Sequence, residues 1–181
     1  MNPHRIKLVL PAAVGLALVC ASLLAQTKNT TQPATFPTAE SVVKELYGLV
    51  SFEPGAPPDW QKVRSLFIDE AVVVLRTARD KTTVFSVQGF VEDFQRFIEH
   101  ADAEQRGFAE RIVRTKPLVF GDIAHVFVLY EASLSDSTRP PTRGIDSFQL
   151  VRKDGRWWIV SIINEICTPQ RPLPPELKDR L

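Results

Sequence analysis

The first half of the chain places apolar residues at the spacing of amphipathic helices. Residues 38–50 begin with Thr38, which can cap a helix, and continue with apolar positions three and four residues apart. Those positions are Ala39, Val42, Val43, Leu46, Tyr47, Leu49 and Val50. The same pattern predicts a short second helix after Asp59 and a third helix after Ser86, with Phe94 on its apolar face.

Strand patterns dominate the rest of the chain. A β-hairpin that pairs 71–75 with 82–85 is predicted between the second and third helices. After the third helix no further helix is expected, and Pro117 should end or kink the first strand that follows. The four long strands are predicted at 106–115, 123–134, 143–152 and 157–167, with turns at Gly121-Asp122, 135–141 and Asp154-Gly155.

This order of elements predicts the fold class. Helices gather in the N-terminal half, whereas the strands of the second half follow one another through short turns, which favours an antiparallel sheet. We therefore expect an α+β domain in which a cone-shaped, curved and mostly antiparallel sheet wraps around three helices.

The N-terminus predicts export. Arg5 and Lys7 precede an apolar run of about 17 residues, which is short for a membrane span and ends in small residues. We expect a signal peptide over 1–25 and an exported protein, periplasmic or secreted, with an uncleaved N-terminal anchor as the main alternative. A lipoprotein is disfavoured because Val19 is bulky where the residue before Cys20 should be small.

Prolines mark both ends of the expected domain. The polar segment 26–37 contains two prolines and predicts a flexible leader. The segment 168–181 contains four prolines, too many for a helix or a central strand, and predicts an extended tail. Between them lies one domain over 38–167, which is long enough to bury a single core.

Charge and cysteine content exclude several functions. Arg5 and Lys7 leave with the signal peptide, so the mature chain has 20 basic and 21 acidic residues. With this nearly balanced charge, nucleic-acid binding has no electrostatic support. Cys167 is then the only cysteine, and no internal disulfide is expected. His100 and His125 have no cysteine or carboxylate at ligand spacing, so we expect no metal site and no cofactor.

Asp146 is the candidate site residue that strand alternation singles out. Asp146, Phe148 and Leu150 share one strand face, and its two apolar members favour an inward orientation. A buried carboxyl group must be hydrogen-bonded, paired or protonated. Either a structural hydrogen bond or contact with a ligand would satisfy this requirement.

Three further polar residues are weaker candidates. His125 either takes part in a site or is an ordinary core or surface histidine. Arg76 follows the first predicted strand and Glu165 ends the last one. These two either face solvent or line the mouth of the cone, where they could form an ion pair.

The last predicted hairpin resembles that of a known superfamily. Residues 143–165 (RGIDSFQLVRKDGRWWIVSIINE) combine an I-D-x-F segment, a turn ending in Asp-Gly and a Trp-x-Ile strand. Together with LFIDEAVVV at 66–74 and the third helix, they resemble the SnoaL-like proteins of the nuclear-transport-factor-2-like superfamily over roughly 38–167. This resemblance implies the cone-shaped fold, which hosts unrelated enzymes, binding modules and assembly domains.

Among these proteins, ketosteroid isomerase gives the best motif match for chemistry. The resemblance places Asp146 at the acid of the oxyanion hole and a tyrosine within one residue of Tyr47. It places the catalytic base near Leu75, which cannot accept a proton. Isomerisation by that mechanism is therefore not the leading interpretation, and no catalytic residue is assigned.

Three functions stay open. The first is binding of a small, largely apolar molecule in a cone-shaped pocket, and the second is an isomerase- or cyclase-type enzyme that uses Asp146. The third is a partner-binding or dimerisation module whose cavity is filled by some of the 11 phenylalanines. The candidate pocket residues are Tyr47, Arg76, Phe94, His125, Asp146 and Phe148. The resemblance implies a homodimer through the sheet, and no membrane contact is expected after signal cleavage.

Overall fold

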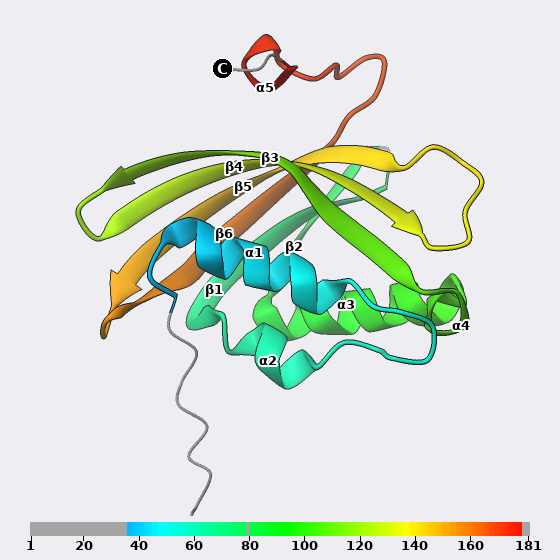
Figure 1. Ribbon diagram of the computed structural model, residues 1–181, viewed down its shortest axis with the longest axis horizontal. Helices are drawn as coiled ribbons and strands as arrows, with labels where there is room; N and C mark the ends of the chain where they lie inside the picture. The colour runs from blue at the N-terminus through cyan, green and yellow to red at the C-terminus, as the bar shows by residue number, and fades with distance from the viewer. Residues whose placement is uncertain (1–35, 79, 179–181) are drawn as a thin grey trace, which may run out of the picture. The chain divides into compact units, whose positions relative to one another are not determined.

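The computed structural model of the chain describes residues 36–78 and 80–178. The expected signal peptide, and all but the last two residues of the expected leader, lie outside the described residues. Figure 1 shows the order of the elements: two helices, a β-hairpin, two helices, four strands and a last short helix. Among the described helices, none is long and apolar enough to cross a bilayer.

The three predicted helices begin where the sequence places them. They are α1 (Ala39–Val50), α2 (Trp60–Arg64) and α3 (Val87–His100). Thr38 caps α1 by accepting the Ser41 N–H, while the Ser41 side chain accepts the Thr38 N–H. Asp59 and Ser86 accept N–H groups in the first turns of α2 and α3. The predicted N-caps are confirmed.

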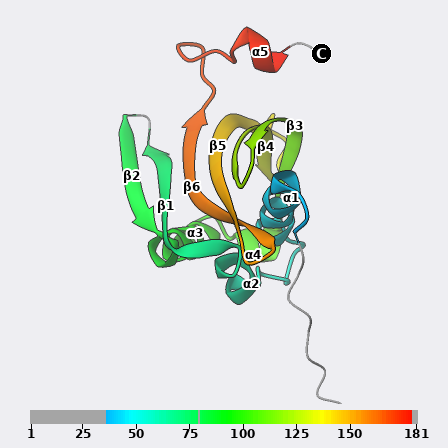
Figure 2. The same cartoon turned by 90° about the vertical axis from the view of Figure 1, so that its left-hand side faces the viewer.

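Six strands form one curved sheet. They are β1 (Phe67–Ala78), β2 (Lys81–Ser86), β3 (Phe108–Phe120), β4 (Ile123–Leu134), β5 (Thr142–Lys153) and β6 (Arg156–Ile166). Their order across the sheet is β2-β1-β6-β5-β4-β3, and only β1 and β6 run parallel. Figure 2 shows the sheet bending without closing on itself. The predicted class, α+β with a cone-shaped and mostly antiparallel sheet, is confirmed.

Two short helices lie where the sequence predicted none. They are α4 (Ala103–Arg106) and α5 (Pro175–Lys178). Each has only four residues, so neither shows the periodicity from which a helix is recognised. The prolines of the tail do not prevent α5, because it begins at Pro175 and the first helical position needs no N–H donor.

The prediction that Pro117 ends β3 is wrong. The strand continues through Pro117 to Phe120, and Pro117 pairs with Val126 of β4. β3 is an edge strand, and an edge strand tolerates the missing N–H donor because one of its sides has no partner strand. A bulge between Ile112 and Arg114 interrupts the register before that point.

The core lies on the concave face of the sheet, under α1 and α3. Its largest wholly buried side chains include Phe148, Leu66, Ile159, Val126 and Val128. Asp146, Phe148 and Leu150 point to this face, with 8%, 0% and 3% of their surface exposed. The inward orientation of Asp146 is therefore confirmed.

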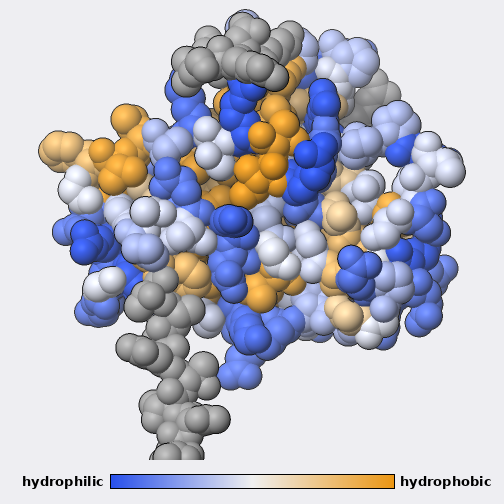
Figure 3. Space-filling view, viewed as in Figure 1, coloured by the Kyte–Doolittle hydropathy of each residue, from blue (hydrophilic) through white to orange (hydrophobic). Residues whose placement is uncertain are grey.

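The β3–β4 hairpin presents apolar side chains to solvent near its turn. Leu118, Phe120 and Ile123 are 75%, 82% and 61% exposed. Figure 3 shows hydrophobic surface gathered at this end of the hairpin, at the left of the view. The homodimer expected through the sheet stays a prediction.

Candidate functional site

A cavity of about 230 Å³ opens beside Asp146, between α1, α3 and the concave face of the sheet. It brings together five of the residues predicted for the pocket, namely Tyr47, Arg76, Phe94, Asp146 and Phe148. The rings of Phe90, Phe94 and Phe148 border this space without filling it. The space beside Asp146 is therefore open, as the binding and enzyme hypotheses require. The third hypothesis, a partner-binding module, expected phenylalanine side chains to fill this cavity, and they do not.

His125 lies outside this cavity. Its neighbours Ala124 and Val126 belong to the core, so alternation along β4 turns the imidazole to the other face of the sheet. There its Nε2 lies 2.7 Å from the Ser147 hydroxyl, and its ring packs on Phe127 with 4.6 Å between ring centroids. It cannot act together with Asp146 on one ligand.

Asp146 is held by neutral hydrogen-bond donors. The Tyr47 hydroxyl donates to Asp146 Oδ2 at 2.5 Å, and Asn164 Nδ2 donates to Oδ1 at 2.7 Å. Asn164 also donates to the Tyr130 hydroxyl at 2.9 Å. The carboxyl group is thus oriented on both of its oxygens, and among the described residues it has no cationic partner.

The strand register explains how these side chains meet. Asp146 lies directly opposite Asn164 in the β5–β6 ladder, and Tyr130 lies opposite Gly144 in the β4–β5 ladder. A Cβ at Gly144 would lie 2.2 Å from the Tyr130 hydroxyl, so the glycine leaves the space that this phenol occupies. Tyr47 completes the cluster from α1, across the concave face.

Glu110 is a second carboxyl group in the cavity, and it was not among the predicted site residues. Its backbone is fixed by Ser51, whose Oγ accepts the Glu110 N–H at 2.9 Å. In the part of the chain that the structure describes, its carboxyl group has no hydrogen-bond or ion-pair partner. The side chain is half-buried, and its accessible surface faces the cavity.

The signal that would have found Glu110 is strand alternation. Phe108 and Ile112 lie two residues to either side of it, on the same face of β3, and both are apolar. This is the argument that placed Asp146 inward.

The cavity raises the pKa values of both acids. Burial raises the pKa of Glu110 to about 8, and the nearby Asp146 carboxylate adds to the increase. Burial also raises the pKa of Asp146 to about 6, while the hydrogen bonds from Tyr47 and Asn164 oppose the increase. Because the two acids interact, we expect the pair to lose its protons in two steps and to hold about one proton near neutral pH.

The two tyrosines stay protonated. Burial, followed by the charges of Asp146 and Glu110, raises the pKa of Tyr47 far above the usual range. Burial and the Asp146 charge likewise raise the pKa of Tyr130. Both phenols are therefore hydrogen-bond donors at every physiological pH, and neither is a proton acceptor.

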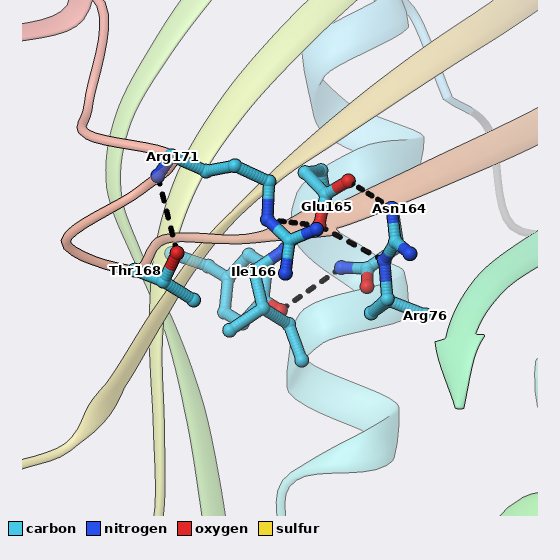
Figure 4. Close-up of polar contacts among 7 residues, drawn as sticks. Arg76, Asn164, Glu165, Ile166, Thr168 and Arg171 are labelled. Carbon is cyan, nitrogen blue, oxygen red and sulfur yellow. Dashed lines mark hydrogen bonds and ion pairs between the residues drawn. The ribbon is translucent and has the colours of Figure 1, made fainter. Parts of the chain in front are cut away.

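Arg76 forms the ion pair with Glu165 that the sequence left open (Figure 4). Its Nε donates to Glu165 Oε1 at 3.1 Å, and a second nitrogen contacts Oε2. The hydrogen bond from Arg76 lowers the pKa of Glu165, as does the bond from the Ile166 N–H. Arg171 of the tail approaches the same carboxylate, with Nε 3.5 Å from Oε1. The Glu165 carboxylate therefore neutralises the charge of Arg76, which lines the cavity.

Leu75, which stands where the resemblance places a catalytic base, also lines the cavity. The carboxyl group that faces this space comes from Glu110 on β3 instead. The described residues contain no group of three histidine, cysteine or carboxylate side chains that could hold a metal ion. The acidic side chains of the cavity can form hydrogen bonds and exchange protons.

An outer cleft of about 710 Å³ adjoins the cavity. Five residues line both spaces: Leu75, Arg76, Phe90, Phe94 and Glu110. The cleft extends from this junction along α3 to the loop between β4 and β5. Glu110 therefore lies at the passage between the outer cleft and the inner cavity.

Comparisons with known proteins bear on the fold. No protein-family model and no curated protein matches the chain. Solved structures do match, among them an NTF2-like protein of unknown function from Pseudomonas putida, with a TM-score of 0.57 and 10% identity. That match covers 78% of this chain and 89% of the other.

Two further structures are similar. A protein of unknown function with a cystatin-like fold from Nostoc punctiforme has a TM-score of 0.54 and 12% identity, over 77% of this chain and all of that one. A Thiobacillus denitrificans chain, described as a candidate calcium/calmodulin-dependent protein kinase type II association domain, has a TM-score of 0.56 and 12% identity. It matches over 75% of this chain and 99% of its own length. The resemblance found in the sequence is thereby confirmed at the level of the fold: the chain has the NTF2-like fold.

Proposed function

We propose that the protein binds a small, largely apolar molecule in the inner cavity and holds an oxygen atom of that molecule at Glu110. The observation that supports this most strongly is the Glu110 carboxyl group, which faces an apolar space without a partner among the described residues. Water that enters the cavity can solvate this group, and a ligand that displaced the water would have to replace its hydrogen bond with a hydroxyl or carbonyl group of its own.

The walls of the cavity suit an apolar body. Besides the polar cluster, the lining is formed by aliphatic and aromatic side chains. The inner cavity and the outer cleft, about 230 Å³ and about 710 Å³, together give the space that small-molecule sites require. The Asp146 carboxyl group, held by Tyr47 and Asn164, fixes the polar end of the cavity, so the ligand would be oriented as well as enclosed.

A ligand-library thermal-shift screen on residues 26–181 tests this proposal. We expect neutral apolar compounds with one hydroxyl or carbonyl group to raise the melting temperature. Glu110→Gln and Asp146→Asn should weaken their binding about 10-fold, because a hydrogen bond to an acidic group is lost or rearranged. Glu131→Gln is the matched control, since Glu131 is as buried as Asp146 but lies on the other face of the sheet. A screen without hits, or equal losses in all three variants, would contradict the proposal.

Acid–base catalysis is the second candidate function, and the acid pair favours it. Glu110 and Asp146 hold pKa values of about 8 and about 6, on either side of neutral pH. Groups with such pKa values exchange protons with a substrate most effectively. The carboxylate form of Glu110 would then accept a proton from a carbon next to a carbonyl group, leaving an enolate, and the resulting carboxylic acid would return a proton to that carbon, while the phenol of Tyr47 stays a hydrogen-bond donor.

Deuterium exchange separates this second function from binding alone. In deuterated water, the protein should speed the loss of the hydrogens next to the carbonyl group of a bound ketone, measured by proton NMR. Glu110→Gln should lower that rate about 100-fold, the usual contribution of a positioned acid or base. A ketone that binds but exchanges at the rate of the buffer reaction would leave only the binding function.

A further inference from the structure

The outer cleft differs in charge from the inner cavity. The inner cavity contains the two acids Glu110 and Asp146, with Arg76 as its only cationic lining residue in the described chain. The outer cleft also includes Arg96 and Arg139, together with the acid Asp93, which is paired with Arg96. The end of the cleft at the loop between β4 and β5 is therefore basic, whereas the end at the inner cavity is acidic.

Arg139 is the basic residue that is available to a ligand. Arg76 is paired with Glu165, and Arg96 is paired with Asp93 at 3.0 Å. The Arg139 side chain, on the loop between β4 and β5, has no ion-pair or hydrogen-bond partner within the described residues. Its guanidinium group keeps all of its donors for an anion, and its planar fork fits a carboxylate.

Aromatic rings connect the two charged regions. Phe94, Phe97 and Phe108 form a cluster of three rings whose centroids are 5.2 to 5.6 Å apart. All three line the outer cleft, and Phe94 also lines the inner cavity. They provide a continuous apolar surface between the Arg139 end of the cleft and the Glu110 end of the cavity.

We propose that the ligand is an amphipathic carboxylate, oriented with its anionic group at Arg139 and its apolar body along this aromatic surface. This inference rests on the proposed function, which places a neutral oxygen of the ligand at Glu110. The reverse orientation would bring the ligand carboxylate against the paired acids Asp146 and Glu110, a like-charge contact once either acid is ionised, in a site of low dielectric constant. The basic end at Arg139 and the acidic end at Glu110 and Asp146 therefore favour a carboxylate ligand in this one orientation.

Two probes that differ only in the head group test the inference. These are 6-(4-hydroxyphenyl)hexanoate and 6-(4-hydroxyphenyl)hexan-1-ol, whose phenol hydroxyl supplies the neutral oxygen for Glu110, titrated calorimetrically into the same protein used for the screen. The carboxylate should bind about 5-fold more tightly, the advantage of a partly exposed ion pair. Raising the salt concentration from about 0.05 M to about 0.5 M should reduce this preference, because the arginine end of the cleft is open to solvent.

Matched variants identify the arginine. Arg139→Gln should reduce the preference for the carboxylate to less than about 2-fold and leave the affinity for the alcohol unchanged. Arg139→Lys should restore part of the preference. Arg152→Gln, an exposed arginine that lines neither space, should change nothing.

The outcomes separate this inference from the proposed function. Equal affinity for both probes, or a preference that survives Arg139→Gln, would overturn the inference while the binding of the alcohol still supported the proposed function. Failure of both probes to bind would overturn the inference as well, and the library screen would then decide the proposed function independently.

Discussion

Asp146 and Glu131 are two buried carboxylates on opposite faces of the same sheet, and their surroundings differ in kind. Asp146 accepts hydrogen bonds from neutral groups, and burial raises its pKa. Glu131 lies between Arg111 and Arg143, and the hydrogen bond from Arg143 lowers its pKa. Its side chain is only 6% exposed because the two arginines, 68% and 59% exposed, cover it.

This difference separates a structural carboxylate from a reactive one. The ion-paired Glu131 keeps its charge throughout the physiological range and has its hydrogen bonds supplied by the arginines. The inner acids have neutral partners or none, so their protonation responds to pH and to a ligand. The exposed fractions of Asp146 and Glu131 are similar, so low exposure alone does not distinguish a reactive carboxylate from a structural one.

The largest expected effect comes from removing each carboxylate in turn. Asp146→Leu leaves the Tyr47 hydroxyl without its acceptor and removes one of the two acceptors of the Asn164 amide, which should cost about 3 kcal/mol of unfolding free energy. Glu131→Leu leaves two arginines that water can solvate, so the loss should be below about 1 kcal/mol. Urea denaturation of both variants measures the difference, and losses of equal size would refute the distinction.

The second effect is a difference in pH dependence. The pKa of Glu110 lies above its ordinary value of 4.5, at about 8, so the folded state binds this proton more tightly than the unfolded chain does. Wild-type stability should therefore fall as the pH rises between these two values. Glu110→Gln lacks the ionisable group, so its stability should not fall in this way. At the upper end of this pH range its unfolding free energy should exceed that of the wild type by about 2 kcal/mol. The difference stays moderate because the open cavity still allows water to reach the wild-type carboxylate.

Glu131→Gln should behave in the opposite way. The folded-state pKa of Glu131 is lowered, so its contribution is present above its unfolded pKa and is lost as the pH falls through the folded pKa. The variant should therefore differ from the wild type at neutral pH and converge with it in acid. Denaturation series from acid to weakly alkaline pH measure both curves, and parallel curves for the two variants would rule out the assigned pKa directions.

The smallest expected effect comes from a substitution at Gly144, which should disturb the hydrogen bonds on the inner face of the sheet alone. In Gly144→Ala the new Cβ would lie 2.2 Å from the Tyr130 hydroxyl, so the phenol must move away from Asn164. We expect a loss of about 1 kcal/mol and a shifted NMR signal of the Asn164 amide, while the Arg143 guanidinium signal stays in place. Gly48→Ala is the control, because no atom of another element lies within 4 Å of the point that its new methyl group would occupy. A shift of both signals would show that the two faces are coupled.

Much of the fold follows from local chemistry in the sequence. The caps at Thr38, Asp59 and Ser86 and the alternation around Asp146 each depend on neighbouring residues, so a single sequence reveals them. Glu110 obeys the same alternation rule, so its inward orientation also follows from neighbouring residues, whereas the resemblance points to Leu75.

Other features depend on contacts between distant residues. The hydrogen bond from Tyr47 to Asp146 joins residues 99 positions apart, and its formation depends on how α1 docks on the sheet. The orientation of His125 could not be predicted because both faces of its strand are rich in apolar residues, including Val126 on one and Phe127 on the other. The sequence pattern shows that Val126 and Phe127 lie on opposite faces of the strand, but it does not show which face is turned to the core.

The position of β6 has a consequence for how the domain folds. This strand is the last of the six to be synthesised, yet it separates the β1–β2 hairpin from the β5-β4-β3 meander in the finished sheet. Until it arrives, the two parts have no shared ladder, and the edges of β1 and β5 stay open to other chains. Pairing across such long sequence separations is slow. We therefore expect the domain to assemble only after β6 is available, and shortened chains that lack it to aggregate.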